Sequence, residues 1–224
     1  MKIPLSDRLR SCCSFVHPGD RVADIGCDHG YLGIYLLKNG IAASVIASDL
    51  REGPLQSAVK NSEKFGVRDK MTFYLSDGVQ NIPRDFDTLV CAGMGGDTMV
   101  SILTAAPWLE NPQYRLILQC QTKTAFLRKY LSENGWGIQA ERIIRDGKFL
   151  YTVMEVLRDE TTHLTPGQCY FPPALADNPP DVLTGYYRYV VKGLENIVLN
   201  RKELADPFAV QALAELKEAD SSTR

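Results

Sequence analysis

One stretch near the amino terminus, Arg21-Val-Ala-Asp-Ile-Gly-Cys-Asp-His-Gly-Tyr31, most constrains how this chain can fold. Its apolar first half is typical of a short buried strand, and residues 31–38 have the apolar spacing of a helix. Gly26 and Gly30 lie between them, where the lack of a Cβ lets the backbone approach a ligand closely. A strand, a glycine turn and a helix form the first half of a nucleotide-binding βαβ unit.

Two acids in this turn, Asp24 and Asp28, argue against a bound diphosphate, because phosphates favour helix N-termini and backbone N–H groups. The dinucleotide pattern G-x-G-x-x-G is also absent. Asp24, Gly26 and Gly30 instead match the acid-x-Gly-x-Gly-x-Gly motif of S-adenosylmethionine (SAM) sites, with Asp28 replacing the middle glycine. We therefore expect a SAM site here; the alternative is an ordinary strand–turn–helix with incidental glycines.

Composition narrows the class of protein. Of the 224 residues, 45% are hydrophobic and 23% are charged, as in ordinary soluble globular proteins. No apolar run reaches transmembrane length and the first residues do not resemble a signal peptide, so the cytoplasm is the expected location. The six cysteines form no C-x-x-C pair and there are only three histidines, so we expect neither a zinc site nor any other bound metal.

The next two predicted strands also end in residues suited to a nucleoside. Residues 44–49 form the second strand and end in Asp49, 25 positions after Asp24, where βαβ folds place a ribose-binding carboxylate. Residues 71–75 form the third, followed by Asp77 and Gly78, which could contact an adenine ring. The alternatives are a helix-capping acid at 49 and a common Asp-Gly turn at 77.

The remaining pattern predicts further β/α units. A helix is expected over 5–16, a fourth strand over 86–92 that runs into Gly93-Met-Gly-Gly96, and a helix over 97–105. A fifth strand is expected over 114–120 and a helix over 123–133. Two apolar runs, 136–145 and 148–157, flank an Asp-Gly pair, which is a strong signal for a β-hairpin. Five β/α units followed by a hairpin are the ground plan of class I methyltransferases.

The composition changes after residue 158, so we divide the chain into a SAM-binding methyltransferase domain, 1–158, and a linker with a C-terminal helical domain, 159–224. Residues 161–180 are rich in Pro, Gly and Thr and predict a loop. Residues 181–204 and 208–217 predict two helices that form a helical hairpin, the second capped by Asp206. The expected buried stripe of the first helix comprises Val182, Tyr186, Tyr189, Val190, Leu194, Ile197 and Val198.

Charge is distributed unevenly along the chain. Residues 115–158 hold 8 basic and 4 acidic side chains, and residues 1–21 hold 4 and 2, whereas the rest is acidic. This distribution is compatible with a basic face that binds a polyanion and equally with basic groups that solvate outer helices.

Four stretches, 5–9, 23–32, 92–96 and 116–119, resemble the bacterial tRNA (adenine-22-N1)-methyltransferases, and the resemblance extends over residues 5–158. It implies an α/β, Rossmann-like class I methyltransferase fold with a mostly parallel seven-stranded sheet, a terminal β-hairpin and a small C-terminal α-helical hairpin. It also implies SAM-dependent methylation of adenine N1 in the D-arm of tRNA. The chain departs from many relatives at Cys120-Gln121, which leaves the role of that loop open.

The motif positions and the resemblance together give the expected site. The residues expected at the methyl-transfer site, with the tyrosine holding the target base, are Asp28, Tyr31, Gly93 and Met94. The residues expected to bind the cofactor are Asp24, Gly26, His29, Gly30, Asp49, Leu50, Asp77, Gly78, Gly93 and Gly95.

The expected partner is tRNA, with no membrane, no obligate protein partner, and a monomer or weak dimer as the oligomeric state. The residues expected to contact the tRNA backbone are Arg8, Arg10, Arg142, Arg145 and Lys148, joined by Lys123, Arg128 and Lys129. Two alternatives stay open: a SAM-dependent methyltransferase that acts on a small molecule or another RNA, and an RNA-binding module without activity.

Overall fold

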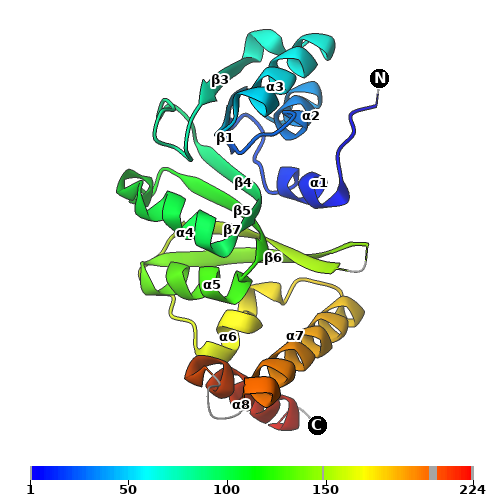
Figure 1. Ribbon diagram of the computed structural model, residues 1–224, viewed down its shortest axis with the longest axis vertical. Helices are drawn as coiled ribbons and strands as arrows, with labels where there is room; N and C mark the ends of the chain where they lie inside the picture. The colour runs from blue at the N-terminus through cyan, green and yellow to red at the C-terminus, as the bar shows by residue number, and fades with distance from the viewer. Residues whose placement is uncertain (1, 148, 202–205, 223–224) are drawn as a thin grey trace.

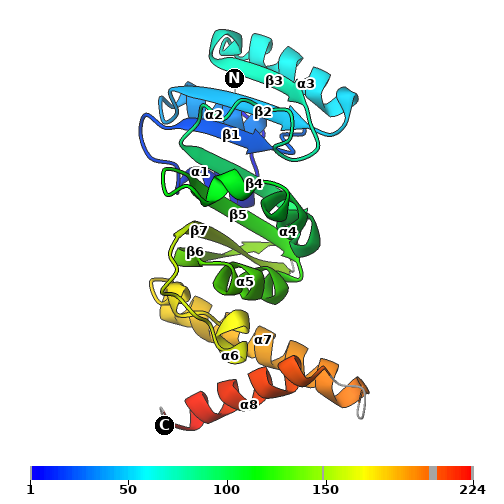
Figure 2. The ribbon, with the colours of Figure 1, turned by 90° about the vertical axis from the view of Figure 1, so that its left-hand side faces the viewer.

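The computed structural model describes residues 2–147, 149–201 and 206–222, and its centre is one seven-stranded sheet of order β3-β2-β1-β4-β5-β7-β6. The first five strands pair in parallel, whereas β7 runs antiparallel to both β5 and β6 (Figure 2). The expected fold class is therefore confirmed. The strands are β1 (Arg21–Ile25), β2 (Ser44–Asp49), β3 (Met71–Leu75), β4 (Thr88–Gly95), β5 (Arg115–Thr122), β6 (Trp136–Asp146) and β7 (Phe149–Arg158).

Helices connect the strands and cover both faces of the sheet. They are α1 (Asp7–Cys13), α2 (Tyr31–Lys38), α3 (Glu52–Lys64), η1 (Arg68–Lys70), α4 (Gly96–Thr104), η2 (Pro107–Glu110), α5 (Thr124–Glu133), α6 (Pro166–Tyr170), η3 (Pro173–Leu175), α7 (Pro180–Arg201) and α8 (Pro207–Ser222). Apolar residues of α1, α2 and α3 form one buried cluster against the sheet, and those of α4 and α5 form another on the opposite face (Figure 1).

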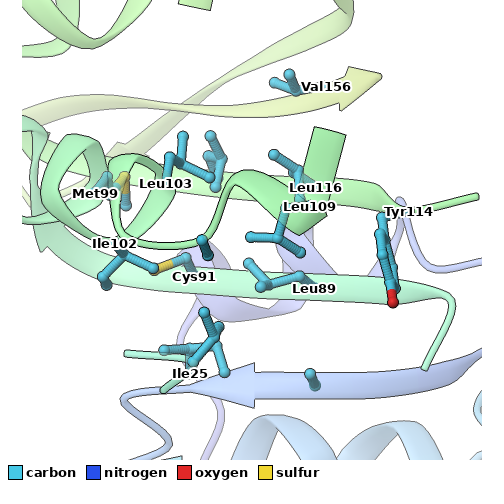
Figure 3. Packing of buried hydrophobic residues seen from close by; sticks show 14 of the residues in the cluster. Ile25, Leu89, Cys91, Met99, Ile102, Leu103, Leu109, Tyr114, Leu116 and Val156 are labelled. Atoms are coloured by element: carbon cyan, nitrogen blue, oxygen red, sulfur yellow. The ribbon is translucent and has the colours of Figure 1, made fainter. Parts of the chain in front are cut away.

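The core between α4 and the central strands fixes the position of the strand ends. Figure 3 shows Met99 and Ile102 of α4 near Cys91 of β4, with Ile25 of β1 beyond it, and Leu89 farther along β4 next to Leu109. Each of these side chains is buried, with an exposed fraction of 8% or less. Burial of this kind contributes roughly 1.5–3 kcal/mol per large apolar side chain, so the ends of β1 and β4 are held in a rigid framework.

The strand order reverses between β1 and β4, which are parallel neighbours with Ile25 opposite Cys91. In open α/β sheets, ligands bind beyond the carboxyl ends of the strands at such a reversal. The turn that follows β1 and the Gly93 segment at the end of β4 therefore lie side by side at this edge.

The predicted hairpin is confirmed: β6 and β7 pair antiparallel, with Asp146 opposite Phe149 at the tip. Gly147 adopts φ +60°, in the left-handed region that such turns require. Lys148 lies outside the described residues.

The expectation of a loop over 161–180 is wrong, because this segment contains α6 and η3. Thr165 accepts a hydrogen bond from the Gln168 N–H at 3.3 Å, and Gln168 bonds back to the Thr165 N–H at 3.0 Å, which forms a capping box at the start of α6. A third buried cluster joins residues of α7 and α8 to Ile143 of β6. The division of the chain at 158/159 stays a prediction.

Helix bounds differ modestly from the expected ones. Helix α1 begins after Ser6, whose side chain accepts from the Leu9 N–H, and α8 extends to residue 222. Asp206 accepts from the Phe208 N–H, which confirms its capping role at the start of α8. Part of the expected α7 stripe is wrong, since Tyr189 and Ile197 are 53% and 41% exposed.

Among the described residues, no helix is both long and apolar enough to cross a bilayer.

Candidate active site

The turn after β1 is held by hydrogen bonds to the end of β2. The N–H groups of Gly26 and Cys27 both donate to the carbonyl oxygen of Ser48, at 2.9 and 2.8 Å. The Asp28 N–H donates to Oδ2 of Asp49 at 3.1 Å. This bond joins an acid expected at the methyl-transfer site to one expected at the cofactor, and it fixes the turn against the end of β2.

Asp28 takes the left-handed conformation, with φ +49°, at the position where SAM motifs place their middle glycine. Aspartate and asparagine tolerate this region better than other non-glycine residues, although it still costs free energy. Gly26 and Gly30 flank it with φ of +72° and +74°. A Cβ on Gly30 would lie 2.9 Å from the Cβ of Ala58, so α3 packs directly against the turn.

A cavity of about 280 Å³ opens at this turn and gathers residues from β1, β4 and α1. It is lined by Arg8, Leu9, Asp24, Gly26, Cys27, Asp28, His29, Tyr31, Leu32, Ala92, Gly93 and Gln121. Six of the predicted catalytic and cofactor residues therefore share one cavity, as the motif spacing requires. Neither here nor elsewhere in the described part of the chain do three His, Cys, Asp or Glu side chains lie close enough together to bind a metal ion.

Asp24 presents a buried acceptor to this cavity. Burial raises the pKa of its carboxyl to about 7; a hydrogen bond from the Gly33 backbone opposes this shift, and the nearby Asp49 carboxylate adds to it. Its Oδ2 has no hydrogen-bond partner among the described residues. A buried carboxylate oxygen without a partner is costly, so this atom fits a ligand that supplies a cationic or hydroxyl donor.

Arg8 presents a complementary buried donor. Its Nε has no hydrogen-bond partner in the described structure, and its nearest acid, Asp146, is 3.9 Å away. Asp24 and Arg8 both line this cavity, and the acceptor on the first and the donor on the second, each without a hydrogen-bond partner among the described residues, match the ammonium and carboxylate of an α-amino acid. The residues present therefore fit the methionine end of SAM.

The Gly93 segment is fixed by a buried glutamine that our sequence analysis did not place in the site. Oε1 of Gln119 accepts from Nη1 of Arg8 at 2.7 Å and from the Gly93 N–H at 3.0 Å, while its Nε2 donates to the Cys120 carbonyl. Gln119 is fully buried, and Gly93 has φ +82°. The signal available in the sequence was a polar residue inside the apolar run of β5.

Met94 occupies the space that a side chain at position 26 would need. A Cβ on Gly26 would overlap the Met94 methyl group, and the Met94 sulfur lies 3.3 Å from that of Cys91. Position 26 therefore favours glycine for its backbone angle, and any side chain there would also displace the flexible end of Met94. Gly95, by contrast, lies against Thr122 of β5 at the end of the strand pair.

Tyr31 stands at the mouth of the cavity, partly buried. Its ring meets Phe65 edge-on at 6.5 Å and lies 5.9 Å from the ring of His29. The side chains of Asp28 and His29 are 65% and 53% exposed and 3.8 Å apart. These three side chains line the cavity and are partly exposed to solvent.

The residues expected at the nucleoside end of the cofactor lie at the carboxyl ends of β2 and β3. Asp49 is buried and also accepts from the Arg51 N–H at 2.9 Å, whereas Leu50 is 65% exposed. Asp77 is exposed, and Gly78 has φ +55°. A Cβ on Gly78 would approach Ile102 of α4 to 2.9 Å, so packing against α4 already requires this glycine.

The predicted tRNA contacts are scattered. Arg10 lies over the Tyr35 ring at 5.4 Å, and Arg142 donates to Oγ of Ser14 at 2.6 Å. Arg145 follows Arg142 by three positions in β6, so strand alternation directs it to the opposite face.

The expectation that Arg128 contacts the tRNA backbone is wrong, because this residue is 1% exposed and cannot reach a phosphate. Its guanidinium is bound to Glu141 instead, because the burial of α5 against β6 requires a paired charge. Lys123 and Lys129 are ion-paired with Asp97 and Glu133, at 2.6 and 3.9 Å.

The seven-stranded sheet ends in an antiparallel hairpin and has a cavity where its strand order reverses. This arrangement is that of the class I methyltransferases. Residues 5–154 match the family described as "Methyltransferase domain". A Bacillus subtilis tRNA (adenine(22)-N(1))-methyltransferase is 31% identical over 154 residues, which cover 68% of this chain and 65% of the relative. The chain belongs to the methyltransferase family that includes this Bacillus protein, as the resemblance predicted.

Solved structures extend the similarity to nearly the whole chain. A Streptococcus pneumoniae protein in complex with SAM is 30% identical, with a TM-score of 0.83, and covers 96% of this chain and 98% of its own. The Bacillus subtilis m1A22 tRNA methyltransferase is 27% identical, with a TM-score of 0.80 and coverages of 97% and 96%. In sequence, the matched stretch spans 61% and 65% of the curated relatives from Mycoplasma genitalium and Bacillus subtilis.

Proposed function

We propose that this chain transfers a methyl group from SAM to N1 of an adenine in tRNA, at position 22 of the D-arm. The observation that carries the proposal is that two residues lining the cavity, Asp24 and Arg8, each have a buried atom without a hydrogen-bond partner among the described residues, Oδ2 and Nε. The similarity to a SAM-bound structure and to a tRNA (adenine(22)-N(1))-methyltransferase supports the choice of cofactor and acceptor. A tRNA substrate agrees with the cytoplasmic location expected from the sequence.

In this proposal, residues at the carboxyl ends of β1, β2 and β3 would hold the cofactor. Asp24 and Arg8 bind its amino-acid end, so Arg8 serves the cofactor rather than the phosphate backbone. Asp49 accepts from the ribose hydroxyls, Leu50 covers one face of the adenine ring, and Asp77 accepts from its amino group. Gly26 and Gly30 keep the turn close to the ligand.

The reaction asks mainly for alignment. When bound, SAM supplies a methyl group already activated by its sulfonium, so adenine N1 attacks with its own lone pair and no base is required. Tyr31 holds the exposed adenine ring at the cavity mouth, and the Gln119-bound Gly93 segment limits its position. The Asp28 carboxylate, 65% exposed at the entrance, stabilises the positive charge that develops on the base.

Nucleoside analysis tests this function directly. The full chain is incubated with labelled SAM and unmodified tRNA transcripts, and the RNA is digested; label is expected in 1-methyladenosine. A transcript with guanine in place of adenine 22 is the matched control and should take up no label. Label that appears only with small acceptors, or calorimetry that detects NAD but not SAM binding, would contradict the proposal.

A further inference from the structure

A second hollow, the α7 groove, opens next to the candidate active site. It has a volume of about 890 Å³ and lies between the end of β5 with the start of α5, the first residues of β7, and α7. Gln121 lines both this groove and the cofactor cavity. Arg8 of the cavity lies over the ring of Tyr151, which lines the groove, at 5.8 Å. The two hollows are therefore neighbours, with Gln121 between them.

The α7 groove presents aromatic rings to solvent. Phe126 on α5 and Tyr189 on α7 are 46% and 53% exposed. Both residues line the groove, from opposite elements. Exposed aromatic rings gathered in one concave surface mark a site that binds a flat or apolar partner.

One of these rings has a rigid support. The Tyr189 ring lies on the ring of Tyr186, with centroids 6.4 Å apart and an interplanar angle of 27°. Tyr186 is buried, and its hydroxyl accepts from Nη2 of Arg128 at 3.3 Å. Arg128 is in turn held by Glu141. Tyr189 therefore projects from a fixed base, as a stacking platform requires.

The charge of the groove selects against a basic partner and favours an anion. Among the described residues that line it, none is aspartate or glutamate, whereas Lys123 and Lys192 are exposed at its edge. Lys123 is paired with Asp97, so Lys192 is the better placed of the two to meet a phosphate.

We propose that the α7 groove binds a nucleotide adjacent to the target adenine in the RNA, with its base stacked on Tyr189 and Phe126 and its phosphate near Lys192. This inference rests on the proposed function. Methylation of N1 requires the target base to leave its pair and its stack, which exposes a face of the neighbouring base. An acid-free aromatic groove next to the cavity supplies a replacement stack of the kind that single-stranded nucleic acids use.

The test replaces the platform residues in the full chain: Tyr189→Ala, Phe126→Ala and the conservative Tyr189→Phe. Because stacking contributes about 1–3 kcal/mol per base, each alanine variant should raise the KM for tRNA roughly 5- to 150-fold. Tyr189→Phe keeps the ring and should behave as wild type. Leu199→Ala is the matched control, since Leu199 lies on α7, is 69% exposed and does not line the groove.

A direct readout uses tRNA with 2-aminopurine at either neighbour of the target adenine. Its fluorescence should be quenched on binding to wild type and Tyr189→Phe, and quenched less by Tyr189→Ala. The affinity for SAM should be equal in every variant, which also shows that each is folded. If wild type forms 1-methyladenosine while the alanine variants match Leu199→Ala in KM and quenching, the groove proposal is overturned and the proposed function stands.

If wild type forms no 1-methyladenosine, the proposed function itself fails. Lys192→Gln adds an electrostatic check: it should lower the slope of log affinity for tRNA against log salt by about 1. An unchanged slope would remove the phosphate part of the proposal. A groove that binds a peptide instead would leave the 2-aminopurine signal and the tRNA KM unaffected by all three platform variants.

Discussion

Arg128 and Glu141 form a fully buried, bidentate ion pair, with Nη2 to Oε1 at 2.6 Å and Nε to Oε2 at 3.2 Å. Nη1 of Arg128 also donates to the carbonyl oxygens of Cys169 and Tyr170, at 2.9 and 3.2 Å. One guanidinium therefore ties α5 and β6 to α6, so the residues after 158 are joined to the sheet by directed bonds as well as by apolar packing.

Arg128→Met should destabilise the protein by about 3–5 kcal/mol, because it leaves the Glu141 carboxylate buried without its partner. Urea unfolding of the full chain measures this change. The double variant Arg128→Met/Glu141→Leu should lose less than the single one, since it buries no unpaired charge. Lys129→Met on the same helix is the control and should change stability by about 0.5 kcal/mol or less. A loss below 1 kcal/mol for Arg128→Met would show that the pair is not structural.

The burial of this ion pair could not be predicted from the sequence. Arg128 and Lys129 are adjacent basic residues on an amphipathic helix, and both resemble surface cations. Arg128 is buried because α6 packs over α5. Helix α6 was not predicted, because residues 161–180 are rich in Pro and Gly. Charge counts along a chain do not reveal which charges are buried.

The glycine turn after β1 was predictable for a physical reason. Strand, glycine and acid occur within one short local segment, so their spacing in sequence fixes their spacing in space. Gln119 was missed as a site residue because it reaches Arg8 across 111 positions. Tyr189 was assigned to the core because helical periodicity locates a stripe only to within one residue on either side.

The raised pKa of Asp24 predicts a pH dependence of stability. A carboxyl whose pKa is about 7 in the folded state and 3.8 when unfolded keeps its proton longer in the folded protein. Stability of the unliganded protein therefore falls, through this group, as pH rises from about 4 to about 7. Asp24→Asn removes this titrating carboxyl, so the stability of the variant relative to wild type should rise as pH increases over that range.

Equilibrium unfolding of both proteins at pH 5 and pH 8 measures the difference. Asp69→Asn, at an exposed position of η1, is the control and should keep the pH dependence of stability that wild type shows. Calorimetry should show that Asp24→Asn binds SAM at least tenfold more weakly, since a hydrogen bond to a charged group contributes about 1.5–3 kcal/mol. Equal SAM affinity would exclude Asp24 from the cofactor site.

Gly26→Ala should weaken SAM binding, for two separable reasons. The left-handed φ costs about 1–2 kcal/mol for alanine, and the new methyl group overlaps the Met94 side chain. The double variant Gly26→Ala/Met94→Ala removes the overlap and should recover part of the affinity measured by calorimetry. Gly40→Ala supplies the control, because Gly40 has φ +64° and nothing within 4 Å, so it tests backbone strain alone. No recovery in the double variant would mean that Met94 does not set the requirement for glycine.

Gln119→Leu should lower kcat for tRNA methylation. It leaves the Gly93 N–H and Nη1 of Arg8 without their acceptor, at a cost of about 1–3 kcal/mol. Gln119→Glu keeps an acceptor for both donors and should therefore restore much of the rate. If Gln119 served only the stability of the fold, this variant should not restore the rate, because it buries a carboxylate. Gln139→Leu, at an exposed position of β6, serves as the control. Unchanged kcat in Gln119→Leu would show that the Gly93 segment needs no such anchor.

The two arginines of β6 give a test of the tRNA surface. Because strand alternation directs Arg142 and Arg145 to opposite faces, their contributions to tRNA affinity should be additive in the double alanine variant. Each single variant should lower the slope of log affinity against log salt by about 1, while SAM binding is unchanged. Lys70→Ala, which precedes β3 at the other edge of the sheet, should have no effect on either quantity. If the double variant binds tRNA with wild-type affinity and slope, the RNA does not approach over β6, and the phosphate contacts must be sought around α7.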